Sequence, residues 1–230
     1  MKTIGLLGGM TWHSTVSYFR AINEETATRL GGLHSAKVVL YSVEFAEMER
    51  FQKEGRWDEA GEVLAGAARA VEAAGADFLL IGTNTMHKVA PRVEAAISIP
   101  LVHIADAAAE ELKTRGLNKA GLLGTRFTME EDFFSGRLKK RHGLDTLVPG
   151  PEDRTLVHRV IYEELGLGVV RDESRTAYLD VIGRLRDRGA QAVILGCTEI
   201  ALLVRQEHTD VPLLDTTTLH ARKAVDLALA

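Results

Sequence analysis

Two short polar segments follow apolar segments at corresponding places in the chain. The first is Gly82-Thr83-Asn84-Thr85, directly after the apolar residues 78–81, and the second is Gly196-Cys197-Thr198-Glu199, directly after residues 192–195. Cys197 is the only cysteine of the chain. A thiolate is a base and a nucleophile, and a helix N-terminus can lower the pKa of a thiol from its usual value of about 8.5. The pattern predicts acid–base or nucleophilic chemistry at Cys197, with a buried, inert cysteine behind the strand as the alternative.

Both segments are also rich in hydrogen-bond donors. Free backbone N–H groups at the start of a helix bind anions such as carboxylates. The hydroxyls of Thr83, Thr85 and Thr198 and the amide of Asn84 add side-chain donors. We therefore expect these segments to bind a small molecule that carries a carboxylate.

The elements that must position these segments are short apolar runs that alternate with longer helical patterns. The predicted strands are 3–8, 37–43, 78–82, 100–104, 119–124, 145–148, 191–196 and 211–214. The predicted helices lie near 14–30, 57–74, 87–97, 104–115, 128–142, 152–165, 174–189, 199–206 and 216–229. Uniformly apolar strands separated by helices indicate parallel sheets that are covered on both faces.

An internal repeat divides the chain into two similar parts. Segments that begin at 5, 78 and 99 resemble segments that begin at 121, 192 and 211, so the offsets are 116, 114 and 112 residues. A nearly constant offset predicts two copies of one α/β unit of about 110 residues each. Ligands of open parallel sheets bind at the carboxyl ends of the strands, which here are followed by residues 8–12, 82–86, 124–128 and 196–199.

Composition limits the classes of function. The 28 basic and 32 acidic residues give a net charge of −4, which offers no basic excess for nucleic acid. No apolar run is long enough for a membrane span. A single cysteine excludes an intramolecular disulfide and a multi-cysteine zinc site, and it fits a reducing cytoplasm. The histidines show no metal-ligand spacing, so we expect no metal site.

Several blocks together resemble the aspartate/glutamate racemase family of cofactor-independent amino-acid racemases. They are GLLGGMTWHSTVSYFRAINE, TNTMHKVA, LLGTRFTMEEDFF, IYEELGLG and LGCTEIALL. The resemblance implies two pseudo-symmetric three-layer lobes, each with a mostly parallel four-stranded sheet, and an active site in the cleft between them. Helices after the fourth strand of each lobe exchange sides, which places lobe 1 at residues 1–102 plus 213–230 and lobe 2 at residues 103–212.

The resemblance also implies a mechanism in which two opposed cysteines flank the substrate α-carbon. One thiolate removes the α-proton, and the other thiol delivers a proton to the opposite face. Cys197 matches one of these cysteines, but Thr83 occupies the place of the other. A threonine hydroxyl does not ionise at neutral pH and is a poor base. We therefore expect Cys197 to deprotonate the L-enantiomer and Thr83, or a water that it holds, to supply the proton.

No cofactor is expected on this interpretation, so donors around the carboxylate must stabilise the α-carbanion. The expected substrate is aspartate or glutamate. Gln52, in a segment that we expect to be a loop, is a candidate for the substrate side chain, with Arg50 and Lys53 as neighbouring alternatives. Glu199 is expected either to order the thiol segment or bind the ammonium group, or to complement a helix dipole. The full set of expected substrate-binding residues is Met10, Gln52, Asn84, Thr85, Thr125, Thr128, Thr198 and Glu199.

Two histidines and three alternative functions complete the expectations. His87 is predicted to lie on a helix surface, with an influence on Thr83 as the alternative, and His103 is predicted to lie in the core or the cleft. The alternatives are an arylmalonate-decarboxylase-like enzyme, a maleate-isomerase-like enzyme, and a non-catalytic sensor of an amino acid. The resemblance further implies a homodimer whose partner molecule is otherwise only its small substrate, with no nucleic acid and no membrane.

Overall fold

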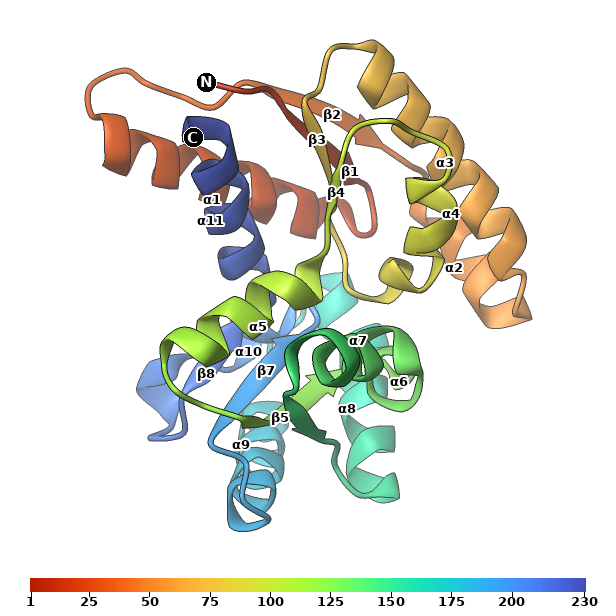
Figure 1. Cartoon of the computed structure of the whole chain (residues 1–230). Coiled ribbons are helices and arrows are strands. Elements are labelled where there is room, and N and C mark those ends of the chain that lie inside the picture. The colour runs from red at the N-terminus through yellow and green to blue at the C-terminus, as the bar shows by residue number, and fades with distance from the viewer. The chain divides into compact units, whose positions relative to one another are not determined.

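The computed structural model describes residues 1–230, which form two compact units. Unit 1 comprises residues 1–104 and 217–230, and unit 2 comprises residues 105–216. Figure 1 shows the consequence for the chain path: the red N-terminal and blue C-terminal segments both belong to unit 1.

Unit 1 contains a four-stranded parallel sheet in the order β2-β1-β3-β4. Its strands are β1 (Ile4–Gly8), β2 (Val38–Ser42), β3 (Phe78–Ile81) and β4 (Leu101–Val102). Its helices are α1 (Trp12–Leu30), α2 (Phe45–Glu54), α3 (Trp57–Ala73), η1 (Thr85–Val89), α4 (Ala90–Glu94) and α11 (Thr216–Leu229), the last of which starts one residue before the unit boundary.

Unit 2 repeats this topology with the strand order β6-β5-β7-β8, again all parallel. Its strands are β5 (Lys119–Gly124), β6 (Asp145–Leu147), β7 (Ala192–Gly196) and β8 (Leu213–Asp215). Its helices are α5 (Ile104–Thr114), α6 (Arg126–Glu130), α7 (Asp132–His142), α8 (Pro151–Glu163), η2 (Leu165–Leu167), α9 (Asp172–Asp187), α10 (Ile200–Leu203) and η3 (Gln206–His208). The two identical strand orders confirm the internal repeat and the predicted α/β fold class.

The central strands are apolar because both of their faces are covered. Every residue of β1, β3 and β7 is buried. In unit 1, Leu7 and Leu79 pack with α2, α3 and α4 on one face, and Leu6 and Leu80 pack with α1 and α11 on the other. Removing such a side chain from water stabilises the fold by about 1.5–3 kcal/mol, so these three layers hold the ends of the strands in place.

The eight predicted strands are all present, but the helix predictions need correction. The segment around Gln52 was expected to be a loop, and it is helix α2. Glu44 caps the start of α2 through the N–H groups of Ala46 and Glu47, and Gly55 ends it in a left-handed conformation. The sequence of α2 is rich in charged residues, and its buried face is formed by only three residues, Met48, Phe51 and Gln52.

Three further helices are shorter or more broken than expected. The predicted helix 87–97 consists of η1 and α4, with Pro91 in the first turn of α4. The predicted helix 128–142 is interrupted at Glu131, whose backbone is extended. The predicted helix 199–206 contains only the four residues of α10, followed by η3. None of the helices is long and apolar enough to cross a membrane.

Candidate active site

In unit 1, the segment after β1 is fixed by Gly9 and two threonines. Gly9 has φ +90°, and a Cβ there would lie 2.1 Å from the Val43 carbonyl oxygen, so only glycine fits. The Gly9 N–H donates to Thr15 Oγ1 at 2.7 Å, and the Thr15 hydroxyl donates to the Thr11 carbonyl at 3.0 Å. Thr11 caps α1 through the Ser14 N–H. These bonds hold the neighbouring Met10, which is buried.

The segment after β3 carries Thr83, Asn84 and Thr85. The Thr83 N–H donates to the Ile81 carbonyl at 2.9 Å, and the Thr83 carbonyl accepts a hydrogen bond from His87 Nδ1 at 2.8 Å. Thr83 is partly exposed, whereas Asn84 and Thr85 are buried. No basic side chain is hydrogen-bonded to the Thr83 hydroxyl, which agrees with a weak acid rather than an activated base at this place.

Gln52 is placed beside this segment by α2. Its side chain is buried, and Nε2 donates to the Met86 sulfur at 3.1 Å. Met86 lies in η1, directly after the polar segment. Arg50 and Lys53 are instead exposed and face Glu47 and Glu49 on the same helix. Of the three candidates for the substrate side chain, the structure brings only Gln52 to the Thr83 segment.

In unit 2, the segment after β7 is organised by Glu199. One carboxylate oxygen, Oε2, accepts from the Cys197 thiol at 3.0 Å and from the Thr198 hydroxyl at 2.7 Å. The carboxylate is buried, whereas Cys197 is partly exposed. Of the roles considered for Glu199, the structure shows that it orders the thiol segment.

The surroundings of the Cys197 thiol favour its protonated form over the thiolate. Burial and the negative charge of Glu199 raise the pKa of the Cys197 thiol well above its ordinary value. A helix N-terminus can lower the pKa of a thiol, but the shift at Cys197 is in the opposite direction. Helix α10 has only four residues, and backbone N–H groups of Thr198 and Glu199 only partly offset the nearby carboxylate.

Thr125 and Thr128 lie after β5, at the place that corresponds to Thr11 and Ser14 in unit 1. Thr125 caps α6 by accepting from the Thr128 N–H at 3.4 Å, as Thr11 does for α1. Thr128 has no exposed surface, and its methyl group lies against Gly124 and Gly196. In this structure both threonines hold the turn, and a contact with substrate stays a prediction.

The structure places His87 against Thr83, as the alternative prediction for this residue requires. It is not on a helix surface, as predicted, but is 1% exposed and hydrogen-bonded to Thr83. Its spacing of four residues from Thr83 was the available signal, because residues i and i+4 lie on one side of a helical turn. His103 is buried, within the range of the prediction.

Glu164 is a buried carboxylate of unit 2 that is not among the expected site residues. Glu164 accepts from the Ser174 hydroxyl at 2.7 Å, and it lies close enough to Tyr178 to affect its titration. Burial, reinforced by the nearby Cys197 and Glu164, raises the pKa of the Tyr178 hydroxyl, which donates to the Val157 carbonyl. The environment around the thiol therefore disfavours negative charge.

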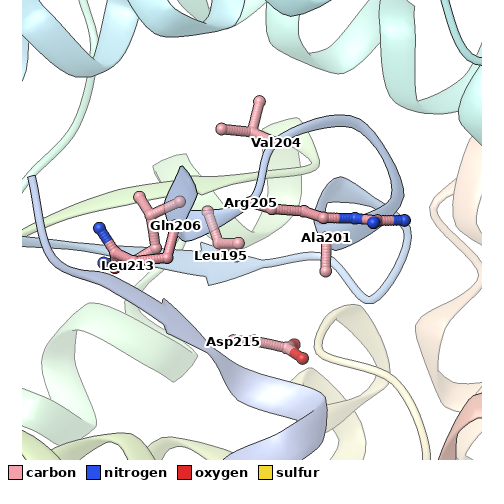
Figure 2. Close-up of a pocket in the computed structure, with 7 residues that line it drawn as sticks. All are labelled: Leu195, Ala201, Val204, Arg205, Gln206, Leu213 and Asp215. Carbon is pink, nitrogen blue, oxygen red and sulfur yellow. Dashed lines mark hydrogen bonds between the residues drawn. The ribbon is translucent and has the colours of Figure 1, made fainter. Parts of the chain in front are cut away.

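Unit 2 also contains a cavity of about 220 Å³ between α10 and the strands β7 and β8 (Figure 2). It is lined by Leu195, Ala201, Val204, Arg205, Gln206, Leu213 and Asp215. None of the expected site residues lines it. Gln206 is fully engaged with backbone groups of Thr209, Val211 and Leu213. This cavity is therefore separate from the thiol segment. No group of three or more His, Cys, Asp or Glu side chains is placed to hold a metal ion.

Comparisons with known proteins agree with this arrangement. A family model described as Asp/Glu/Hydantoin racemase matches residues 7–224. The crystal structure of a candidate Asp/Glu racemase from Yersinia pestis is 51% identical, with a TM-score of 0.94 and full coverage of both chains. An aspartate racemase homologue from Pyrococcus horikoshii is 34% identical, with a TM-score of 0.86 and full coverage of both chains.

A more distant relative is the broad specificity amino-acid racemase RacX of Bacillus subtilis. It is 21% identical over 175 residues, which are 75% of this chain and 74% of RacX. The family model includes both sheets and both polar segments. The chain therefore belongs to the Asp/Glu/Hydantoin racemase family of amino-acid racemases.

Proposed function

We propose that this protein racemises an acidic amino acid, aspartate or glutamate, without a cofactor. The observation that carries the proposal is the hydrogen bond of 3.0 Å from the Cys197 thiol to the Glu199 carboxylate. It gives the sole cysteine a proton acceptor at contact distance. Thr83 follows the equivalent strand of unit 1, so the reaction has one thiol and one hydroxyl available.

The proposed reaction begins with transfer of the Cys197 proton to Glu199 Oε2. The resulting thiolate takes the α-proton of the L-enantiomer, and the S–H bond forms again. The electron pair of the broken C–H bond is delocalised into the substrate carboxylate, which backbone N–H groups and the side chains of Asn84, Thr85 and Thr198 would stabilise. A proton from Thr83, or from a water that it holds, then binds the opposite face. Solvent restores the proton at Thr83 and receives the one on Glu199.

Gln52 is proposed to bind the distal carboxylate of the substrate. Its buried amide is a neutral donor beside the Thr83 segment, whereas the nearby cations Arg50 and Lys53 point into solvent. Met10 is proposed to line the same site.

We also propose that the protein is a cytoplasmic homodimer, and sedimentation analysis of the purified chain tests the dimer.

The test is proton NMR of L- and D-aspartate and of L- and D-glutamate in D₂O with the purified protein. We expect loss of the α-proton signal with wild type and none with Cys197→Ser. Exchange of the α-proton should be faster from the L-form than from the D-form. Thr83→Cys should reduce this difference between the two exchange rates. Binding without exchange would indicate a sensor. Absence of both would direct the search to malonates and maleate.

A further inference from the structure

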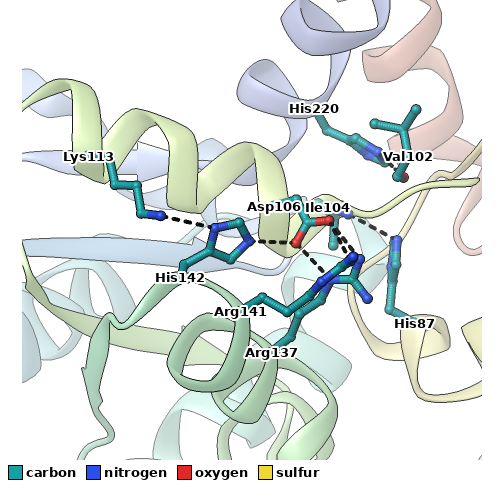
Figure 3. A network of polar contacts seen from close by, with 9 residues as sticks. All are labelled: His87, Val102, Ile104, Asp106, Lys113, Arg137, Arg141, His142 and His220. Atoms are coloured by element: carbon teal, nitrogen blue, oxygen red, sulfur yellow. Dashed lines mark hydrogen bonds and ion pairs between the residues drawn. The ribbon is translucent and has the colours of Figure 1, made fainter.

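His87 is held between two backbone groups of unit 1. Its Nδ1 lies 2.8 Å from the Thr83 carbonyl oxygen, and its Nε2 lies 3.2 Å from the Ile104 nitrogen. A carbonyl oxygen only accepts and a backbone N–H only donates, so Nδ1 carries the proton and Nε2 does not. The imidazole is therefore neutral, and both of its nitrogens are used. Figure 3 shows the bond to Ile104.

The two bonds connect the Thr83 segment to the start of the helix that leaves unit 1. Ile104 is the first residue of α5 and the last residue of unit 1. The corresponding residue of unit 2 is Thr216, the first residue of α11, whose hydroxyl donates to the Leu195 carbonyl at 2.8 Å. Leu195 lies two residues before Cys197. In both units, the first residue of the helix that follows the fourth strand is thus anchored to the chain beside the proposed catalytic residue.

The neighbours of His87 hold its ring in place. The rings of His103 and His220 lie with their centroids 4.3 Å and 6.0 Å from that of His87. His220 donates from Nε2 to the Val102 carbonyl and accepts at Nδ1 from the Tyr18 hydroxyl. All three histidines are buried. His220 is thus a buried histidine with two hydrogen bonds in the same cluster, and neither of the two involves Thr83.

We propose that His87 is a positioning residue, which orients the Thr83 hydroxyl so that protonation occurs on the face opposite Cys197. This inference rests on the proposed racemase function. The bond to the Thr83 carbonyl fixes the peptide plane next to the side chain that supplies the proton. A misplacement of about 1 Å at a reacting group can lower a rate by about a hundredfold. Cys197 lies in another unit and does not depend on this bond.

We expect His87 variants to keep removal of the α-proton by Cys197 and to lose delivery of a proton from the Thr83 side. With L-aspartate or L-glutamate in D₂O, proton NMR measures loss of the α-proton, and chiral chromatography measures formation of the D-enantiomer. We expect His87→Ala and His87→Gln to lower the ratio of D-product to lost α-proton by about tenfold or more. His87→Asn keeps an N–H near the position of Nδ1, so its ratio should stay close to that of wild type.

The ratio does not depend on how much of a variant is folded, because both events occur on the same active molecules. His220→Gln is the matched control: it removes a buried histidine from the same cluster and should leave the ratio unchanged. Equal loss of both events in the His87 variants, with an unchanged ratio, would overturn the positioning role while the racemase function stands. A wild-type protein that exchanges no α-proton would overturn the proposed function and this inference with it.

Discussion

At the scale of single residues, the main feature is a thiol whose proton is held by a carboxylate. Glu199 stabilises the protonated form of Cys197 and raises the pKa of the thiol. The same carboxylate is the nearest acceptor when the thiol must become a base. Glu199 disfavours the thiolate of Cys197 at rest, and the proposed mechanism also gives it the opposite role of accepting the thiol proton during turnover.

We predict that Glu199→Gln separates these two properties. Loss of the negative charge lowers the pKa of Cys197, so alkylation by iodoacetamide at neutral pH should become faster. Loss of the proton acceptor should slow α-proton exchange by about a hundredfold or more, within the range of general-base contributions. The matched control is Glu207→Gln, at an exposed carboxylate of unit 2 that lies near Arg205. Slower alkylation together with unchanged exchange would contradict the assigned role.

At the scale of elements, ion pairs attach α5 to the body of unit 2. Asp106, in the first turn of α5, accepts two hydrogen bonds of 2.7 Å from Arg137 and one of 2.8 Å from His142, both in α7 (Figure 3). Burial by itself would raise the pKa of Asp106, but the bonds from Arg137 and His142 hold it below its ordinary value. The carboxylate thus stabilises the fold in its charged form.

Asp106→Asn should lower the free energy of unfolding by about 2 kcal/mol at neutral pH, because hydrogen bonds to charged groups contribute about 1.5–3 kcal/mol. The folded-state pKa is depressed, so this contribution is present above the ordinary pKa of 3.8 and is lost as the pH falls through the folded-state value. Urea unfolding at several pH values measures the loss of stability in the variant and its dependence on pH. The difference in the free energy of unfolding between wild type and variant should become smaller in acid. Asp132→Asn, at an exposed carboxylate that faces Lys140, should have little effect at any pH.

At the scale of the whole molecule, a ligand that binds only the folded chain must stabilise it. L-Aspartate or L-glutamate at 100 times its dissociation constant should add about 2.7 kcal/mol to the free energy of unfolding. Cys197→Ser should show the same gain, because the groups proposed to bind the carboxylate are backbone N–H groups and hydroxyls rather than the thiol. Thermal unfolding of wild type and Cys197→Ser with each amino acid measures this gain in stability. A folded protein that neither amino acid stabilises would rule out acidic amino acids as ligands.

The sequence by itself determined the fold class and the repeat, and it predicted a place for the chemistry. Uniformly apolar strands such as Phe78–Ile81 and Ala192–Gly196 are buried on both faces, and a strand of that composition has few other stable environments. The repeated offset predicted two sheets with one strand order, and both are observed. The polar segments at Thr83 and Cys197 were identified because they follow those strands directly.

Only the tertiary structure decided the direction in which the pKa of the thiol shifts and the partners of the candidate site residues. The pKa of Cys197 depends on where the Glu199 carboxylate points, and side-chain direction is not encoded in spacing alone. Gln52 reaches Met86 from 34 residues away, because α2 packs against η1. His87 was misassigned because one imidazole can lie in solvent or between two backbone groups. The bond joins His87 to Ile104, 17 residues further along the chain, and Ile104 lies just after β4, which pairs with β3.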